Sequence, residues 1–177
     1  MLLTYPVVIS DASVLIALAK MRRLEILRQT YSTVLIGPIV KNEVVDAGKR
    51  IAASGSEIVE DAIKQEWIQV VQPTAKERRL TKKLGNNAHL DLGEAEAIAL
   101  ASYRKHLLLV DDKEGRAVAT MLDVVHIGTA GVLLETYFKG MMDFAQLEND
   151  LQTLTEVIWL SPEVVLAILK KARETKQ

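Results

Sequence analysis

Residues 90–112 read LDLGEAEAIALASYRKHLLLVDD, and two different structural patterns meet within them. From about Gly93 to Lys105, small and apolar residues occur on nearly every side, which indicates a helix that is largely buried. Residues 107–110 form a short, wholly apolar run, typical of a strand that is covered on both faces. Asp111 and Asp112 then end this strand. A buried helix that leads directly into a buried strand predicts an α/β fold with parallel strands.

Short apolar strands alternate with helices along the rest of the chain. Further strands are predicted at residues 7–10, 33–36, 68–71 and 124–127. Helices are predicted at about residues 12–20, 24–28, 39–47, 54–65, 74–84, 114–122, 128–137, 144–154 and 162–175, and residues 85–92 are predicted to be irregular. This alternation predicts a parallel sheet of about five strands with helices on both faces. No repeat or long linker divides the chain, so we expect one domain, residues 1–177, with an α/β core to about residue 140 and a helical extension over residues 141–177.

The composition excludes several classes of protein and of site. The 177 residues include no cysteine, which rules out disulfides, thiol nucleophiles and thiolate zinc sites. A net charge of −1 does not by itself indicate a nucleic-acid binder. Because no apolar run approaches the roughly 20 residues that span a bilayer, and the first residues lack the basic region of a secretory signal, we expect a cytoplasmic protein without a membrane partner. The three histidines are scattered, and a metal pair at His89 and Asp91 is less favoured than an ordinary polar loop.

Several carboxylates occur where ordinary surface charge is not expected. Asp11 directly follows the first predicted strand, and Asp111 and Asp112 directly follow the fourth. In open parallel sheets, ligands bind outside the carboxyl ends of the strands, where the strand order reverses. If these two strands are neighbours, their acids meet in space.

Two further acids lie on apolar faces of predicted helices. Glu43 falls within the apolar stripe of the helix at residues 39–47. Glu94 shares the face of Ala97 in the first turn of its helix, and Glu96 is a rival for the same role. A carboxylate on a core-facing stripe is costly unless it is paired or binds a metal.

Each acid also has an ordinary structural explanation. Asp11 is equally well explained as a helix N-cap, and Asp111 and Asp112 as a turn or cap. Glu94 suits the positive end of a helix, and Glu43 could pair with a buried arginine. Together, however, four or five carboxylates at one end of a sheet would repel one another unless a divalent cation were bound. Ligands that are all oxygen favour Mg²⁺ or Mn²⁺, as one or two ions.

These motifs resemble the PIN domain, the metal-dependent nuclease fold of VapC-type toxins and related ribonucleases. The matching stretches are VISDAS at 8–13, VKNEVV at 40–45, LDLGEAEAIALA at 90–101, LLVDDKEGR at 108–116 and HIGTAGVLL at 126–134. The resemblance covers nearly the whole chain and implies a three-layer α/β/α fold. It implies that the catalytic residues are Asp11, Glu43, Glu94 and Asp112, and that the metal ligands are Asp11, Glu94, Asp111 and Asp112. The choice between Asp111 and Asp112 stays open, because the family more commonly has Ser or Thr two residues before its single acid.

The resemblance also implies supporting residues, an activity and partners. Ser13 matches a small hydroxyl residue that supports the first acid, although a plain helix N-terminal hydroxyl explains it equally well, and Thr129 matches a residue near the site. The implied activity is hydrolysis of RNA phosphodiester bonds with Mg²⁺ or Mn²⁺. The chain would be a candidate toxin of a toxin–antitoxin pair, with an antitoxin protein and a second copy of the chain as candidate partners.

Basic residues near these motifs are candidates for RNA contact. The net charge of −1 becomes +3 once four site acids are left out. The candidates are Lys76, Arg78, Arg79, Lys82, Lys83, Lys113 and Arg116. For the run at residues 76–83, the alternative is an ordinary solvated helix face.

Two other functions compete with the ribonuclease. One is a non-catalytic module of the same fold that binds nucleic acid or a protein partner. The other is a phospho-acceptor receiver domain, which we disfavour because its acid pair should follow the first strand, whereas here the pair follows the fourth.

Overall fold

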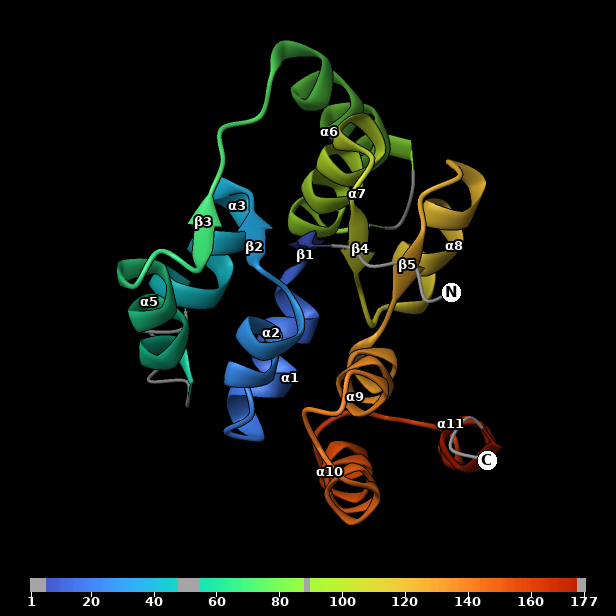
Figure 1. Ribbon diagram of the computed structural model, residues 1–177. Helices are drawn as coiled ribbons and strands as arrows, with labels where there is room; N and C mark the ends of the chain where they lie inside the picture. The colour runs from blue at the N-terminus through green and yellow to red at the C-terminus, as the bar shows by residue number, and fades with distance from the viewer. Residues whose placement is uncertain (1–5, 48–54, 88–89, 175–177) are drawn as a thin grey trace.

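A five-stranded parallel sheet lies between two layers of helices (Figure 1). The computed structural model describes residues 6–47, 55–87 and 90–174. Its strands are β1 (Val7–Ser10), β2 (Thr33–Ile36), β3 (Ile68–Val70), β4 (Leu107–Leu109) and β5 (His126–Ile127). Every neighbouring pair is parallel, and the order across the sheet is β3-β2-β1-β4-β5. The predicted α/β/α fold with about five strands is therefore confirmed.

The helices fall close to the ranges that the sequence predicts. They are α1 (Ala12–Lys20), α2 (Glu25–Thr30), α3 (Pro38–Lys41), the π-helix η1 (Asn42–Ala47), α5 (Ser56–Lys64), α6 (Ala75–Asn87), α7 (Leu92–Arg104), α8 (Lys113–Met121), α9 (Thr129–Phe138), α10 (Phe144–Val157) and α11 (Pro162–Glu174). The prediction of an irregular segment from residue 85 is wrong, because α6 continues to Asn87. The fifth strand is also shorter than predicted, although the Val125 carbonyl still accepts a hydrogen bond from the backbone of Leu108.

Alternating strand residues build two separate hydrophobic cores. Side chains of successive strand residues point to opposite faces of a sheet. On one face, Val8 and Leu109 pack among α1, α2, α5, α9 and α10. On the other, Ile9 and Leu108 pack against α7 and α8. Strands that are apolar on both sides are thus explained by the helical layer on each face.

The C-terminal extension packs onto the first of these cores. Leu147, Leu151 and Leu154 of α10 are fully buried in the same cluster as α1 and α9. An ion pair of 2.8 Å joins Arg23 to Asp150 of α10. Figure 1 shows α10 and α11 beside α9, on the side away from α6 and α7. The extension therefore shares a core with the α/β layers.

The strand order reverses between β1 and β4, the two central strands. From β1 the chain goes to β2 and β3 on one side, and later to β4 and β5 on the other. Ser10 is in register with Leu109, and the Asp11 N–H donates to the Leu109 carbonyl at 3.1 Å. The acids after both strands therefore meet at the switch point, where open α/β sheets bind their ligands.

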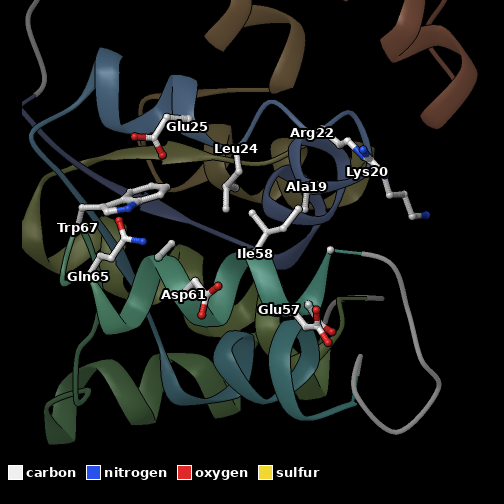
Figure 2. A pocket seen from close by; sticks show the side chains of 13 residues that line it. Ala19, Lys20, Arg22, Leu24, Glu25, Glu57, Ile58, Asp61, Gln65 and Trp67 are labelled. Atoms are coloured by element: carbon white, nitrogen blue, oxygen red, sulfur yellow. The ribbon is translucent and has the colours of Figure 1, made fainter.

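A hollow of about 840 Å³ lies elsewhere, between α1, α2 and α5 (Figure 2). Its lining includes Ala19 at the end of α1 and Trp67 just before β3, so it opens at the amino end of the sheet. None of the acids singled out in the sequence lines it. In the part of the chain that the structure describes, no helix is long and apolar enough to cross a membrane.

Candidate active site

Asp11 is the most deeply buried carboxylate at the switch point, with 1% of its surface exposed. It is the N-cap of α1 and accepts a hydrogen bond from the Val14 N–H at 3.3 Å. The Ser13 hydroxyl lies 2.7 and 2.8 Å from its two oxygens. Burial raises the pKa of Asp11 to about 7, and the nearby charges of Asp111 and Glu94 add to the increase. The cap and the acid cluster, which the sequence offers as alternatives, thus coexist in one residue.

Asp111 lies beside Asp11 and is held by the start of α9. Its carboxylate accepts hydrogen bonds from the Thr129 N–H at 2.7 Å and from the Thr129 hydroxyl at 2.6 Å. Its own N–H donates to the Ser13 hydroxyl at 3.0 Å, so Ser13 connects the two aspartates. A Cβ at Gly128 would lie 2.6 Å from an Asp111 oxygen, and only glycine lets α9 begin this close.

Asp112 has a different environment from its neighbour. Its side chain is exposed and accepts hydrogen bonds from the backbone N–H groups of Glu114 at 2.7 Å and Gly115 at 2.9 Å. These contacts make it the N-cap of α8, the ordinary function of an aspartate at this place.

Glu94 reaches this cluster from the first turn of α7. Its N–H donates to the Asp91 carboxylate at 2.7 Å, and its carboxylate accepts from the Asp91 N–H at 3.3 Å, which together form a capping box. Burial raises the pKa of Glu94 to about 7, with further increases from the charges of Asp91 and Asp112. Asp91 is thus a further acid of the cluster, and the Asp-x-x-Glu capping pattern is the signal in the sequence that marks it. His89, its suggested metal partner, lies outside the described residues.

Glu43 and Glu96 lie side by side but have different partners. The Gly93 N–H donates to Glu43, whose pKa is raised to about 7 by burial and by the charges of Asp91 and Glu96. A Cβ at Gly93 would collide with the Glu43 carboxylate, so the glycine lets α7 approach η1. The acids that act on Glu43 are therefore Asp91 and Glu96, whereas Asp11 interacts with Asp111 and Glu94.

Glu96, the rival for Glu94 in the sequence, caps another helix. It is 3% exposed, and its carboxylate accepts hydrogen bonds from the backbone N–H of Ile39 at 2.9 Å and from that of Val40. The N-cap of α3 is Gly37, which has no side chain with which to cap the helix. Since a Cβ at Gly37 would overlap the Glu96 carboxylate, that carboxylate replaces the missing cap. Glu96 thereby fixes the helix that leads to Glu43.

The candidate RNA-contact residues lie on two helices beside this cluster. Lys113 and Arg116 are exposed on α8, next to Asp112. The other five are exposed on α6, which packs along α7.

The chemistry of the cluster suits a hard divalent cation, although the side chains do not enclose one as placed. Within residues 6–47, 55–87 and 90–174, no three Asp, Glu or His side chains stand in position to hold a metal ion. The available donors are carboxylate oxygens, which Mg²⁺ and Mn²⁺ prefer. Burial raises the pKa values of Asp11, Glu43 and Glu94 to about 7, and the charges of neighbouring acids add to the increase. A bound cation would favour the charged carboxylates.

Comparison with known proteins places this architecture in a family. A family model described as PIN domain matches residues 7–174. The chain belongs to the PIN-domain family. The match includes the helical extension as well as the α/β core, and it supports the resemblance that the motifs suggest. No curated protein sequence matches the chain significantly.

Membership in this family gives the acid cluster its context. PIN domains have a nuclease-type fold, and the acids of this PIN domain gather at the carboxyl ends of β1 and β4 and the start of α7. A further acid, Glu43, faces the same helix start from η1.

Proposed function

We propose that this PIN domain is an endoribonuclease that depends on Mg²⁺ or Mn²⁺ and hydrolyses RNA phosphodiester bonds. The observation that carries the proposal is the pairing of Asp11 and Asp111 at the ends of adjacent strands, with Glu94 within reach of their charge. Repulsion between acids at the switch point lowers the stability of the fold, so packing alone does not explain why they are placed there. One or two divalent ions would neutralise them and attract a phosphate.

In this proposal Asp11, Asp111 and Glu94 hold the metal. We favour Asp111 over Asp112 because the side chain of Asp112 is engaged in the α8 cap, whereas the charge of Asp111 acts on Asp11 and its carboxylate is oriented by Thr129. Glu94 would leave its long 3.3 Å contact with the Asp91 N–H to join them. Glu43 stays a candidate catalytic acid on the other side of the α7 start.

The protein groups would orient and shield the reacting atoms. A bound Mg²⁺ or Mn²⁺ would supply a water of lowered pKa and stabilise the leaving oxygen. Ser13 and Thr129 would keep the aspartate oxygens in fixed orientations, as outer hydrogen-bond partners of metal ligands do. The exposed Lys113 and Arg116 would attract the phosphate of the substrate.

Cleavage of RNA by the purified protein tests the proposal directly. We expect a mixed pool of RNAs to be cut with Mg²⁺ or Mn²⁺ and to stay intact with EDTA. Cleavage that persists in EDTA, or no cleavage of any RNA in the pool with either metal, would contradict it.

Metal binding should also stabilise the fold, independently of any substrate. At a Mg²⁺ concentration about 100 times Kd, a ligand that binds only the native state adds about 2.7 kcal/mol, or roughly 5–10 °C in Tm for a chain of this size. Thermal denaturation with Mg²⁺, with Mn²⁺ and with EDTA measures this shift. Asp111→Asn should reduce the shift, and an equal shift in that variant would contradict the proposed ligand set.

Replacing Thr129 with valine should weaken the site while the fold is kept. The change removes the 2.6 Å hydrogen bond from the Thr129 hydroxyl to Asp111 and leaves the backbone N–H bond in place. Loss of such an outer partner typically costs 10- to 100-fold in metal affinity or activity, and we expect about that loss in cleavage rate. Thr120→Val on the exposed face of α8 is the matched control. Equal rates for both variants would show that Thr129 does not orient the site.

A non-catalytic binding module is the second candidate function. It is favoured by the finding that, in the described part of the chain, no three potential ligands are arranged around a metal position. Such a module would bind RNA or a partner without turnover. Tight RNA binding with no cleavage and no Mg²⁺-dependent rise in Tm would select it over the nuclease.

We extend the proposal to a cytoplasmic toxin whose activity an antitoxin protein restrains. The resemblance to VapC-type toxins supports this extension, as does the match to the PIN-domain family. We propose a homodimer on the same ground. Induced expression in a bacterial host should arrest growth, and Asp11→Asn should abolish the arrest. Growth at the normal rate with soluble wild-type protein would remove the toxin role, and sedimentation as a monomer would remove the dimer.

A further inference from the structure

The exposed side of α6 is purely cationic. Five basic residues of this helix are exposed: Lys76, Arg78, Arg79, Lys82 and Lys83. At 100° per residue, their side chains fall within one arc of about 160° around the helix axis. The opposite side carries Glu77, Leu80, Thr81 and Leu84, which are buried or half-buried. Glu77 is the one acidic residue of this helix, and it is turned inward with 2% exposure. The exposed side therefore has five positive charges and no negative charge.

Several exposed cations elsewhere in the molecule have acidic partners on their own element or on the next one. Arg28 pairs with Glu25, Lys41 with Asp46, and Lys64 with Glu60 and Asp61. Lys170 likewise pairs with Glu174 on α11. Within the described parts of the chain, Lys76, Arg79, Lys82 and Lys83 make no ion pair. Some exposed cations on other elements, such as Lys20 and Lys105, also make none, but only α6 gathers four of them on one side of a single described helix. A solvated helix face usually mixes both signs of charge, and α6 departs from that pattern.

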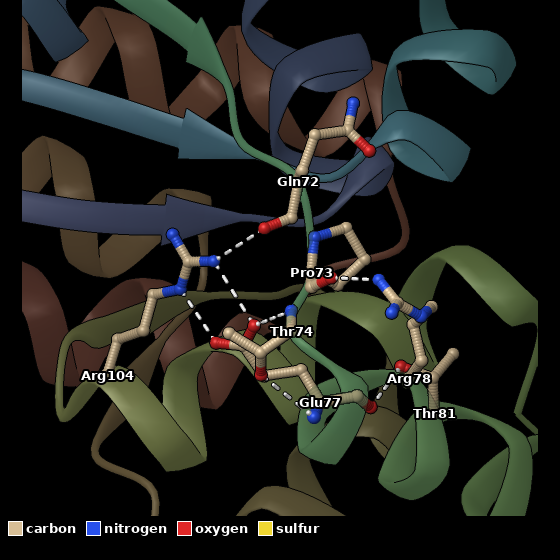
Figure 3. Close-up of polar contacts among 7 residues, drawn as sticks. All are labelled: Gln72, Pro73, Thr74, Glu77, Arg78, Thr81 and Arg104. Carbon is tan, nitrogen blue, oxygen red and sulfur yellow. Dashed lines mark hydrogen bonds and ion pairs between the residues drawn. The ribbon is translucent and has the colours of Figure 1, made fainter.

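The inward turn of Glu77 fixes α6 against α7 (Figure 3). Its carboxylate accepts hydrogen bonds from Nε of Arg104 at 2.7 Å and from the Thr74 N–H at 2.6 Å, and its N–H donates to the Thr74 hydroxyl at 3.3 Å. Arg104, at the end of α7, also donates to the Gln72 carbonyl at 3.1 Å. These hydrogen bonds hold the first turn of the cationic helix in place.

The other end of α6 lies next to the candidate active site. A Cβ at Gly85 would lie 2.9 Å from the side chain of Leu92, the first residue of α7, which lies between Asp91 and Glu94 of the capping box. Lys82 and Lys83 lie within one turn of Gly85, whereas Lys76 lies toward Arg104 at the far end of α7. The cationic side thus extends away from the acid cluster for about 10 Å, at 1.5 Å per residue.

We propose that the cationic side of α6 binds the phosphate backbone of a single RNA strand as it leaves the active site. The inference rests on the proposed function and extends it, because it assigns a second contact region outside the acid cluster. Ten ångströms is about the axial span of three phosphates in a helical strand. The surface carries lysine and arginine but no aromatic residue, so it reads the charge of the backbone and not the bases.

RNA binding without turnover tests this proposal. The full chain carrying Asp11→Asn is titrated onto a fluorescent single-stranded RNA of about 20 nucleotides, in EDTA and in Mg²⁺, at several salt concentrations. The test variant adds Lys76→Gln, Arg79→Gln, Lys82→Gln and Lys83→Gln. The matched control adds Lys20→Gln, Arg28→Gln, Lys64→Gln and Lys170→Gln, which remove the same charge from other helices.

The test variant should bind at least about tenfold more weakly at 0.1 M salt, and its salt slope should fall by about 2 to 3, at about 0.7 per phosphate contact. The control should bind like the parent. The same factor should apply to oligo-U and oligo-A, and replacing Lys76, Lys82 and Lys83 with arginine should retain binding. Equal weakening in test and control variants, unchanged binding in the test variant, or a parent that does not bind RNA would overturn the proposal.

The outcome is separable from the nuclease proposal. A chain that binds RNA through α6 but never cleaves it would retain this inference and remove the nuclease. A chain that cleaves RNA and is unaffected by the four α6 substitutions would retain the nuclease proposal and remove this inference. In the wild-type chain with Mg²⁺, cleavage should become more efficient as the RNA is lengthened, and the four substitutions should remove that dependence.

Discussion

Asp11→Asn should abolish metal-dependent RNA cleavage and leave the fold intact. Asparagine keeps the shape of the side chain and can still cap α1 by accepting from the Val14 N–H. It removes the negative charge from the most buried acid of the cluster. Loss of an outer partner of a metal ligand already costs 10- to 100-fold, so loss of the ligand itself should exceed about 100-fold. The rate of cleavage of a defined RNA at saturating Mg²⁺ measures the effect.

The same substitution should make the metal-free protein more stable, because asparagine is not penalised by burial as a charged carboxylate is. Thermal denaturation in EDTA should therefore show a Tm at or above that of the wild-type chain, which separates loss of the site from loss of the fold. Asp123→Asn, an exposed position with φ of 54°, is the control, since asparagine tolerates this conformation. Full cleavage by Asp11→Asn, or equal losses in both variants, would contradict the assignment of the site.

Arg104→Met should destabilise the fold by about 3 kcal/mol, the lower end of the cost of leaving a buried charge without its partner. Glu77 is 2% exposed, and Arg104 supplies two hydrogen bonds to its carboxylate, at 2.7 and 3.2 Å. Methionine retains much of the packing of the arginine stem but leaves the carboxylate without its cation. Urea denaturation at pH 7 measures the free energy of unfolding. Arg28→Met, which breaks an exposed pair of 3.4 Å with Glu25, should cost less than about 1 kcal/mol.

The pH dependence and a double variant identify the cause of this loss. The hydrogen bond from Arg104 lowers the pKa of Glu77 below its usual 4.5. The stability that the pair contributes is therefore present above pH 4.5 and is lost as the pH falls through the lowered pKa. The loss of unfolding free energy caused by Arg104→Met should therefore become smaller as the pH falls below 4.5. Glu77→Leu combined with Arg104→Met should recover most of the lost stability, because apolar replacements of buried pairs are often neutral. A double variant that is as unstable as Arg104→Met alone would show that lost packing, and not the unpaired carboxylate, is the cause.

Most elements of the fold could be predicted from the chain alone, because each strand is short and apolar and each helix has its own periodicity. The segment at 39–47 shows where this fails. Its apolar stripe predicts one helix, but the structure has α3 followed by the π-helix η1. The Glu96 carboxylate caps α3 from a distance of 57 residues along the chain, and no local pattern contains such a partner. Gly85, Asn86 and Asn87 usually mark a turn, so the sequence predicts an irregular segment where α6 in fact continues to Asn87.

The candidate site was only partly accessible to the same reasoning. The sequence places Asp11 and Asp111 after strands, and the residues that orient them, Ser13 and Thr129, could be named only through a family resemblance. The difference between Asp111 and Asp112 depends on the start of α9, which lies about 18 residues further along the chain. Asp91 could have been found from its capping pattern with Glu94. Its effect on Glu43, however, depends on how closely α7 approaches η1.

The sequence by itself determined the class of the fold, the parallel sheet, the set of carboxylates available and the absence of any thiol site. These properties follow from local periodicity and composition, which do not depend on distant partners. Only the tertiary structure decided which acids become neighbours, since that depends on β4 pairing with β1. It likewise decided that Glu96 and Glu77 are buried structural acids, and that Glu77 leaves a purely cationic side on α6. A carboxylate's function depends on its solvation and its partners, and both are fixed by contacts between residues far apart in the chain.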